Sequence, residues 1–340
     1  MKAVSIVDKQ KVKFQNLPQP ELMGSNEVKV QTRLVGICGS DMHIYHASNG
    51  LADLPRIIGH EVCGEVTEVG DNVRTVAVGD HVVVDPISYC EKCYACRKGR
   101  PNICEHLSVF GVHEDGGLRE SFILPEKNIW KMNKDIPWTD IVLAEPYTIG
   151  AQAVSRGKVQ PGDRVFIQGA GPIGLCIMRM AKIRGAQVII SDMLPERLEF
   201  AKQQGADHVI SAKNQNALEE IDFWTEGEGA NVVIDSVCLK STFELGIEAA
   251  SIGGRVVTLS FDSLPAAIPQ APITRKELDI VGSRLQTHQF GDVVRMINNG
   301  QLRSDGLVSH TFSFQDSAEA FQFVESSPSA VRKAVIEVTK

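Results

Sequence analysis

Residues of metal-binding type fall into two groups with different compositions. Four cysteines stand in C-x2-C-x2-C-x7-C spacing, at Cys90, Cys93, Cys96 and Cys104. Four thiolates with no other ligand type suit a closed, tetrahedral structural zinc. Upstream, Cys38, His60 and Glu61 mix a thiolate, an imidazole and a carboxylate, a set that can leave a coordination position open for chemistry. The sequence therefore predicts a zinc enzyme with one structural and one catalytic metal site.

Two further polar residues stand close to the mixed set. Cys38 lies in the segment G-I-C-G-S-D-M-H, which also carries Ser40 and His43. Taken singly, these three residues could be a small buried hydrophobe, a helix cap and a surface histidine. Together with His60, Glu61 and a nucleotide motif further along the chain, they supply metal ligands, a proton path and a hydride acceptor. We therefore interpret Ser40 and His43 as a catalytic proton relay.

A glycine-rich turn predicts a dinucleotide site. Gly169, Ala170, Gly171, Pro172, Ile173 and Gly174 follow the strand-like segment RVFIQ and open the helical segment GLCIMRMAKIRG. A strand before the G-x-G-x-x-G pattern and a helix after it indicate a dinucleotide-binding turn. The first glycine permits the tight turn, and the second lets a pyrophosphate approach the backbone. The third lets helix and strand pack closely, and the helix amino terminus attracts the phosphates. A glycine-rich turn without a ligand is the alternative.

The next strand ends at Asp192, which bears on the choice of cofactor. A carboxylate at this position accepts hydrogen bonds from the ribose hydroxyls and repels a 2′-phosphate, so it favours NAD over NADP. An aspartate that only caps the following helix is the alternative. Arg197 lies five residues further on, and we include it in the cofactor site. The intervening segment MLPE does not make a basic 2′-phosphate pocket.

The periodicity of the chain changes twice. Up to about Glu145, β-branched runs such as Glu27–Leu34, Glu61–Val69 and His81–Val84 are cut by Gly, Pro and Asp, which is typical of an irregular β-rich domain. From about Gly150 to Leu285, strands and helices alternate, which predicts an α/β doubly wound parallel sheet. The strands are expected at Arg164–Gln168, Val188–Asp192, Val209–Ser211, Val232–Asp235, Arg255–Leu259 and Asp279–Val281, and the helices at Gly174–Arg184, Pro195–Gln204, Gln215–Thr225 and Thr242–Ala250. The last stretch is expected to hold helices near Gly291–Asn299 and Asp316–Val324 and a strand at Lys333–Val338.

Composition excludes several classes of protein. With 340 residues and 43% hydrophobic content, the chain has enough apolar material for two domain cores. A net charge of −7 without any basic block argues against a nucleic-acid partner. The amino terminus lacks the features of a signal peptide, and we expect no membrane span. The predicted compartment is the cytoplasm, where the eight cysteines would be reduced.

The whole chain resembles the zinc-dependent medium-chain alcohol dehydrogenases. The resemblance is carried by G-H-E at 59–61, the four cysteines at 90–104 and G-A-G-P-I-G at 169–174. Glu145, in the segment Ala-Glu-Pro, stands where ethanol-type enzymes place a cysteine ligand, so the chain is more similar to the sorbitol and threonine dehydrogenase branch. The resemblance implies that Glu145 is a further ligand of the catalytic zinc. The resemblance leaves open whether Glu61 binds zinc directly or orients the zinc site without binding the ion. For Glu145, the alternative is an exposed carboxylate at the start of a helix.

The same resemblance implies an architecture. We expect a GroES-like β-rich catalytic domain at 1–147, a Rossmann NAD-binding domain at 148–287 and a return to the catalytic domain at 288–340, with the active site in the cleft between the domains. The four-cysteine zinc would order a loop and take no part in hydride transfer. Free thiols are the alternative there. A homodimer or homotetramer built through the Rossmann sheet edges is also implied. Cys63 and Cys176 are expected to fill the core, and Cys238 has no assigned role.

Polar residues suggest a polyhydroxylated or acidic substrate. Arg284 stands where sorbitol dehydrogenase-like enzymes carry an arginine near the polyol, and its planar fork could bind hydroxyls or a carboxylate; a surface arginine is the alternative. His113 and Arg119 add polar groups to the expected pocket wall. The chain is similar to the starvation-sensing branch of the family and to hexonate 5-dehydrogenases. Four short motifs carry this similarity: Y-H at 45–46, H-E-D-G-G at 113–117, E-P-Y-T-I at 145–149 and S-R-L at 283–285.

That similarity implies a small-molecule sugar acid substrate. The expected reaction is oxidation of L-gulonate or L-galactonate at a secondary hydroxyl to D-fructuronate or D-tagaturonate, with hydride transfer to NAD. A neutral polyol or L-threonine is one alternative, to be separated by a substrate panel. A non-catalytic zinc-binding regulatory protein is the other. The joint presence of Cys38, Ser40, His43, His60 and Glu145 argues against it.

Overall fold

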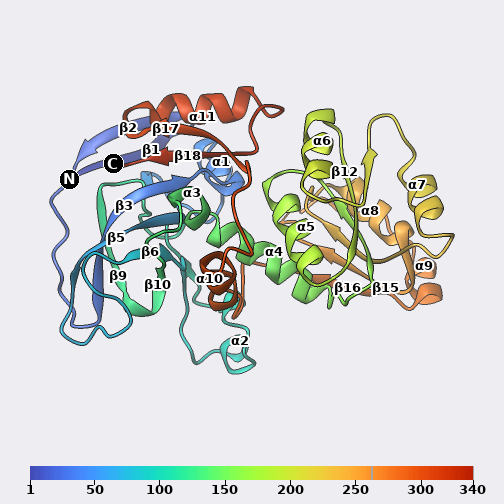
Figure 1. The fold of residues 1–340 in the computed structure, drawn as a ribbon, viewed down its shortest axis with the longest axis horizontal. Helices are drawn as coiled ribbons and strands as arrows, with labels where there is room; N and C mark the ends of the chain where they lie inside the picture. The colour runs from blue at the N-terminus through green and yellow to red at the C-terminus, as the bar shows by residue number, and fades with distance from the viewer. Residues whose placement is uncertain (262, 340) are drawn as a thin grey trace. The chain divides into compact units, whose positions relative to one another are not determined.

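The computed structural model describes residues 1–261 and 263–339. Contacts between Cα atoms divide the chain into two compact units (Figure 1). The catalytic unit comprises Met1–Glu145 and Thr287–Lys340, and the nucleotide unit comprises Pro146–Gln286. The carboxyl-terminal stretch therefore belongs to the same compact unit as the amino-terminal one.

The catalytic unit is built mainly of strands. These are β1 (Lys2–Asp8), β2 (Lys11–Asn16), β3 (Glu27–Gly36), β4 (Arg56–Ile57), β5 (Glu61–Val69), β6 (His81–Val84), β7 (Ile87–Ser88), β8 (Ser108–Val109), β9 (Ser121–Pro125), β10 (Ile129–Met132), β17 (Val308–Ser313) and β18 (Lys333–Glu337). Its helices are α1 (Gly39–Tyr45), α2 (Tyr94–Arg97), α3 (Trp138–Ile141), α10 (Phe290–Asn298) and α11 (Ser317–Ser326), with 3₁₀ turns at Pro101–Ile103, Glu126–Asn128 and Phe314–Asp316. The predicted β-rich first domain is confirmed.

Three neighbouring strands of the larger sheet bring Glu61 and Lys333 together. The sheet runs β10-β6-β5-β3-β18-β17, with β9 also paired to β3. Its central strand β3 pairs antiparallel with β5 on one side, where Gly36 faces Glu61, and with β18 on the other, where Val335 faces Gly36. Strand β18 comes from the end of the chain, so residues near 61 and 333 are brought together across β3.

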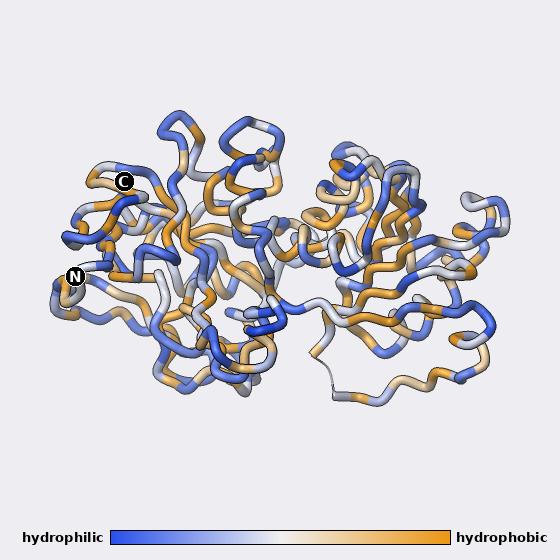
Figure 2. Tube along the Cα trace, turned by 90° about the horizontal axis from the view of Figure 1, so that it is seen from below, coloured by the Kyte–Doolittle hydropathy of each residue, from blue (hydrophilic) through white to orange (hydrophobic). Residues whose placement is uncertain are grey.

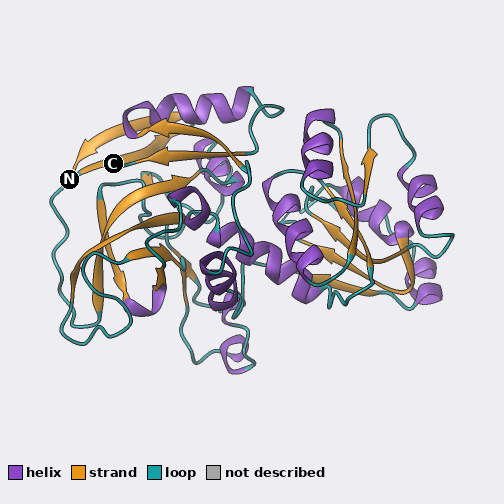
Figure 3. Cartoon of the chain, viewed as in Figure 1, coloured by secondary structure: helices purple, strands orange, loops and turns teal. Residues whose placement is uncertain are grey.

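The nucleotide unit is a doubly wound parallel sheet with helices on its faces (Figure 3). Its strands are β11 (Arg164–Gln168), β12 (Gln187–Asp192), β13 (His208–Ser211), β14 (Ala230–Asp235), β15 (Ala250–Thr258) and β16 (Asp279–Gly282), in the order β13-β12-β11-β14-β15-β16. Its helices are α4 (Ala144–Arg156, which begins in the catalytic unit), α5 (Pro172–Ile183), α6 (Pro195–Gln203), α7 (Ala217–Trp224), α8 (Lys240–Ala249) and α9 (Gln270–Lys276). This strand order is that of a Rossmann sheet, so the predicted fold class is confirmed.

Hydrophobic residues run along the strands of this sheet (Figure 2). Val165, Phe166 and Ile167 of β11 and Val233 and Ile234 of β14 are fully buried, as expected for parallel strands covered on both faces. No helix within 1–261 and 263–339 has the length and apolar character needed to cross a bilayer.

The elements differ from the sequence-based expectation at several points, among them the unexpected helix α9 and strand β17, the start of β15 and the presence of helix α4. Strand β15 begins at Ala250 rather than at Arg255, because Ala250 pairs with Ala230 before a register shift. The Gly253-Gly254 pair, with Gly253 at φ 69°, looks like a strand break in the sequence but lies inside the strand. Helix α4 was not expected, because Pro146 and Gly150 interrupt its helical pattern.

Candidate active site

The mixed ligand set converges at the edge of helix α1. Cys38 is the N-cap of α1, His60 directly precedes β5, and Glu61 is the first residue of β5. One ligand atom from each of the three side chains lies within 4.8 Å of the others. His60 and Glu61 are buried, and Cys38 is half-buried. The structure therefore brings together three residues that are 23 positions apart in sequence at most.

A cluster of glycines holds His60 in place. Gly59 has φ 98°, and a Cβ atom on Gly111 or Gly116 would lie within about 2.5 Å of its carbonyl oxygen. The backbone N–H of Gly117 donates to that same oxygen at 2.9 Å. The loop that carries His113 is thus packed backbone to backbone against the residue before His60, and side chains at these positions would push the ligand out of place.

Asp41 is a site residue that the sequence interpretation did not assign. Its Oδ2 accepts the backbone N–H of Cys38 at 2.9 Å, and its Oδ1 lies 3.5 Å from Nδ1 of His60. Burial alone would lower the pKa of His60, but Asp41 and then Cys38 raise it well above the ordinary value. A carboxylate behind a metal-binding histidine fixes the ring and its tautomer. The sequence carries a signal for this contact, because an acidic residue three positions after an N-cap residue often accepts the backbone N–H of that residue.

Lys333 is the second residue that was missed. Its buried Nζ lies 2.7 and 2.8 Å from the two carboxylate oxygens of Glu61 and donates to the carbonyl of Ile37 at 3.1 Å. The pair meets over Gly36, where a Cβ atom would lie 2.0 Å from Oε2 of Glu61. The absence of a side chain at Gly36 therefore allows a lysine from β18 to reach a carboxylate on β5.

Glu145 lies in the first turn of α4 and is only 4% exposed. Burial raises the pKa of Glu145 to about 7, with His60 and Lys333 opposing the rise and Glu61 adding to it. Its carboxylate is therefore electrostatically coupled to the mixed ligand set. A buried carboxyl group with a raised pKa that interacts electrostatically with His60 and Glu61 fits a site that is completed by a divalent cation.

We expect the stability of the zinc-free enzyme to fall as pH rises through 7, because of Glu145. Its pKa of about 7 in the folded protein lies above the ordinary value of 4.5, so its stabilising contribution is complete below pH 4.5 and is lost as the pH rises through 7. Glu145→Gln should remove an effect on the order of 2 kcal/mol. Denaturant unfolding of chelator-treated wild type and variant at pH 5 and pH 8 measures it; parallel pH profiles would contradict the assignment.

The proposed relay residues lie on α1. Oγ of Ser40 is 3.5 Å from Nε2 of His60, which places it beside the mixed ligand set. His43 is exposed, and its Nδ1 lies 3.3 Å from Oγ of Ser48. Residues three apart on a helix share a face. The arrangement leads from the buried ligands to solvent.

The four cysteines form a separate cluster with the dimensions of a zinc site. Their sulfurs lie within 4.8 Å of one another, with separations of 3.4, 3.5 and 3.8 Å for three pairs. Tetrahedral zinc–thiolate bonds place sulfurs about 3.8 Å apart. Backbone N–H groups of Cys96 and Glu105 lower the pKa of Cys93 to about 6, whereas burial and neighbouring thiols raise the pKa of Cys96 to about 12. Such a difference between the pKa values of two thiols is expected when the thiols lie close together, because the first thiolate disfavours ionisation of the second. A bound divalent cation would stabilise all the thiolates.

The glycine turn has the shape of a dinucleotide cradle. Gly169 has φ 93°, and a Cβ atom on Gly174 would lie 1.8 Å from the carbonyl oxygen of Gly169, so this close approach requires glycine. At Gly171 a Cβ atom would meet only Nη1 of Arg197, at 3.8 Å. Gly171 is the N-cap of α5, Pro172 and Ile173 form its first turn, and no side chain caps it. Backbone N–H groups at such a terminus suit a pyrophosphate.

Asp192 and Arg197 lie at this turn. Asp192 accepts the backbone N–H groups of Ala170 and Leu194, both at 2.9 Å, and Nη1 of Arg197 lies 3.7 Å from its Oδ2. The carboxylate thus ties the end of β12 to the glycine turn. The carboxylate of Asp192 and the guanidinium of Arg197 therefore lie close together beside the glycine turn.

The three substrate candidates lie in different places. Arg284 follows β16 in the nucleotide unit, with its guanidinium carbon 5.5 Å from the ring centroid of Phe261. His113 accepts the backbone N–H of Val109 at 3.1 Å, and Arg119 donates to the carbonyl of Asp115 at 3.2 Å and lies over Phe110. The contacts of His113 and Arg119 brace the loop that packs on Gly59. Arg284 lies over the exposed ring of Phe261 in the nucleotide unit.

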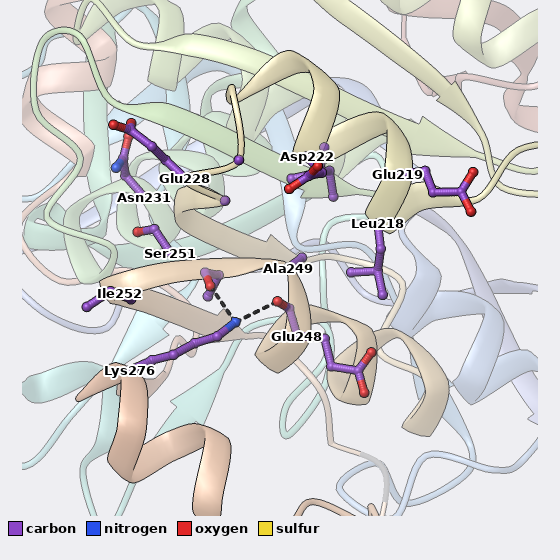
Figure 4. Close-up of a pocket in the computed structure, with 14 residues that line it drawn as sticks. Leu218, Glu219, Asp222, Glu228, Asn231, Glu248, Ala249, Ser251, Ile252 and Lys276 are labelled. Carbon is purple, nitrogen blue, oxygen red and sulfur yellow. Dashed lines mark hydrogen bonds between the residues drawn. The ribbon is translucent and has the colours of Figure 1, made fainter.

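An open hollow of about 840 Å³ lies elsewhere on the nucleotide unit (Figure 4). It is lined by residues at the amino ends of β14 and β15, including Glu228, Asn231 and Ser251. Lys276 in this hollow donates to the carbonyls of Glu248 and Ala250 at 2.7 Å. None of the predicted site residues lines it, and its lysine holds the end of α8.

Two family models match the chain. Residues 24–134 match the alcohol dehydrogenase GroES-like domain, and residues 172–299 match the zinc-binding dehydrogenase domain. The starvation-sensing protein RspB of Escherichia coli K12 is 40% identical over 311 residues, which cover 91% of this chain and 90% of the relative. The L-galactonate-5-dehydrogenase of the same organism is 32% identical over 311 residues, with the same coverage of 91% and 90%.

A solved structure extends the similarity to the whole fold. The crystal structure of an rspB alcohol dehydrogenase from E. coli CFT073, complexed with NADH, superposes with a TM-score of 0.92 at 37% identity and covers 99% of each chain. The chain belongs to the zinc-dependent medium-chain alcohol dehydrogenase family and is a dehydrogenase that acts on CH–OH groups.

Proposed function

We propose that this enzyme oxidises a secondary hydroxyl of a sugar acid and transfers the hydride to NAD. The proposed substrates are L-gulonate and L-galactonate, and the proposed products are the 5-keto acids D-fructuronate and D-tagaturonate. Similarity to an L-galactonate-5-dehydrogenase over 91% of the chain supports this substrate class. Similarity to a dehydrogenase complexed with NADH supports the cofactor.

The observation that carries the proposal is the placement of Arg284. It stands two residues beyond the end of β16, and the ring of Phe261 that faces it stands three residues beyond the end of β15. The backbone N–H of Ser283 donates to the carbonyl of Thr258 at 2.9 Å and joins the two strand ends. Ligands of doubly wound folds bind at the carboxyl ends of the strands. A guanidinium fork at that edge suits a carboxylate.

The residues of the catalytic unit would have separate roles in metal binding and proton transfer. Cys38, His60 and Glu145 would hold zinc, with Asp41 orienting His60 and Lys333 restraining Glu61. Bound zinc supplies Lewis acidity that makes a substrate hydroxyl acidic near neutral pH. Ser40 would accept the hydroxyl proton, and His43, exposed on the same helix, would pass it toward solvent. Bound NAD supplies the hydride acceptor.

Glu61 fits an orienting role better than a ligand role. Both of its oxygens lie within 2.8 Å of Nζ of Lys333, so the carboxylate of Glu61 forms a buried ion pair with the lysine. Glu145 is buried, burial raises the pKa of its carboxyl group, and it interacts electrostatically with His60 of the mixed ligand set. We therefore propose Glu145 as the carboxylate that binds the metal.

We expect Arg284→Gln to raise KM for L-gulonate by about 100-fold, because a charge-assisted bidentate contact contributes about 3 kcal/mol. KM for sorbitol, which has no carboxylate, should change little. Arg284→Lys keeps the charge without the fork and should give an intermediate value. NADH formation under initial-rate conditions measures all three. An equal rise for the acid and the polyol would contradict a carboxylate contact.

We further propose a cytoplasmic homodimer or homotetramer. The eight cysteines have no disulfide partners among the described residues, which suits a reducing compartment. Strand β16 lies at the edge of the parallel sheet with Ile280 exposed, and a second copy could pair along that edge.

A further inference from the structure

We propose that Asn102, in the four-cysteine lobe, is a positioning residue for the segment that carries Arg284. The lobe, defined here as residues 90–104, would hold residues 284–288 in place through Thr287. This inference rests on the proposed function in one respect, the role of Arg284 in reading the substrate. The zinc of the lobe would then influence substrate binding without touching the substrate.

The contact is a hydrogen bond from Oγ1 of Thr287 to Oδ1 of Asn102. Asn102 is 1% exposed and lies in the 3₁₀ turn Pro101–Ile103, directly before the ligand Cys104. The turn is closed by the N–H of Ile103 donating to Arg100 at 3.2 Å and by that of Cys104 donating to Pro101 at 3.0 Å. The acceptor on Asn102 is therefore fixed by the same backbone that presents Cys104 to the metal.

The segment joined to Thr287 has an unusual backbone. Leu285 and His288 have φ values of 47° and 56°, and neither is a glycine. Left-handed conformations of branched or bulky residues persist only where surrounding contacts hold them, and they are frequent at functional sites. Gln289 donates through Nε2 to the carbonyl of Thr287 at 3.0 Å on the carboxyl side. On the amino side, Ser283 is bound to the end of β15.

Thr287 joins this segment to the lobe through its hydrogen bond to Asn102. It is the first residue of the returning part of the catalytic unit, and Arg284 precedes it by three residues, which span at most about 11 Å of chain. Freeing Thr287 would release the strained residues on either side and let the guanidinium of Arg284 move. Loss of the lobe zinc would have the same consequence, because the turn that presents Asn102 depends on Cys104.

The test compares Thr287→Val, which removes the donor at nearly constant volume, with Thr287→Ser, which keeps it. Thr287→Val should raise KM for L-gulonate roughly fivefold, as expected for one lost hydrogen bond, with kcat nearly unchanged. Amide hydrogen exchange in the peptide covering 283–289 should accelerate, while that in 90–98 stays protected and zinc content is unaltered. Thr287→Ser should restore both KM and exchange, and Asn102→Ala should repeat the effects of Thr287→Val.

Two results would overturn the proposed hold of Asn102 on residues 284–288. One is unchanged exchange at 283–289 in both Thr287→Val and Asn102→Ala. The other is loss of zinc together with equal changes in all kinetic constants, which would indicate a generally weakened lobe. The exchange measurement needs no substrate, so an enzyme inactive on sugar acids would contradict the proposed function without deciding this test. Faster exchange at 283–289 with normal KM would overturn the link to Arg284.

Discussion

Cys38→Ala should lower kcat/KM by at least about 1,000-fold, because it removes a proposed ligand of the metal that would make the substrate hydroxyl acidic. The sulfur lies within 4.8 Å of ligand atoms on His60 and Glu61. Metal analysis should show one zinc lost from each chain while the four-cysteine zinc stays. The measurements are zinc content of the purified variant and initial rates of NADH formation.

Cys63→Ala is the matched control. Cys63 is also buried, but its sulfur lies near the carbonyls of Leu34 and Trp138 at 3.8 and 3.7 Å, and burial raises the pKa of its thiol. It therefore behaves as a core residue. The control should retain both zinc ions and most activity while losing about 1 kcal/mol of stability. If Cys38→Ala kept full activity and both ions, the mixed site would not be the catalytic metal site.

Lys333→Met should reduce the free energy of unfolding by about 3 kcal/mol, because it leaves the buried Glu61 carboxylate without its cation. The lysine and glutamate side chains are 2% and 1% exposed. Adding Glu61→Gln should recover more than half of the loss, since no buried charge then remains unpaired. Denaturant unfolding of the single and double variants of the zinc-free enzyme measures the effect.

A pair with an exposed lysine provides the comparison. Nζ of Lys131 also lies 2.7 Å from a carboxylate oxygen, that of Asp80; the aspartate side chain is 9% exposed, but the lysine side chain is 56% exposed. Lys131→Met should therefore cost less than about 1 kcal/mol. Equal losses for the two lysine variants would mean that burial does not set the strength of the Lys333–Glu61 pair.

The sequence predicted features whose signals are local. The segment RVFIQ was placed correctly as Arg164–Gln168, because a buried parallel strand is a continuous apolar run followed here by a glycine turn. The parallel sheet followed from the alternation of such runs with helices. The β-rich first unit followed from its short β-branched segments.

Features that depend on residues far apart were not predictable. Lys333 and Glu61 are separated by 272 positions, and only the pairing of β18 and β5 with the same strand brings them together. Nothing local to a lysine at the start of an apolar strand indicates a buried partner. Asp41 is different, because its place three residues after the N-cap Cys38 is a local pattern that indicates an acidic residue bound at the start of a helix.

The substrate assignment is the central claim, and one comparison tests it most directly. Zinc-loaded enzyme is mixed with NAD and either L-gulonate, L-galactonate, sorbitol or L-threonine, and NADH formation is followed under initial-rate conditions. We predict that kcat/KM for one of the two hexonates exceeds that for sorbitol and L-threonine by at least about 100-fold, since a site built around a charged contact rejects analogues that lack it. Equal or greater efficiency with sorbitol or L-threonine, or no NAD reduction with any of the four compounds, would contradict the claim.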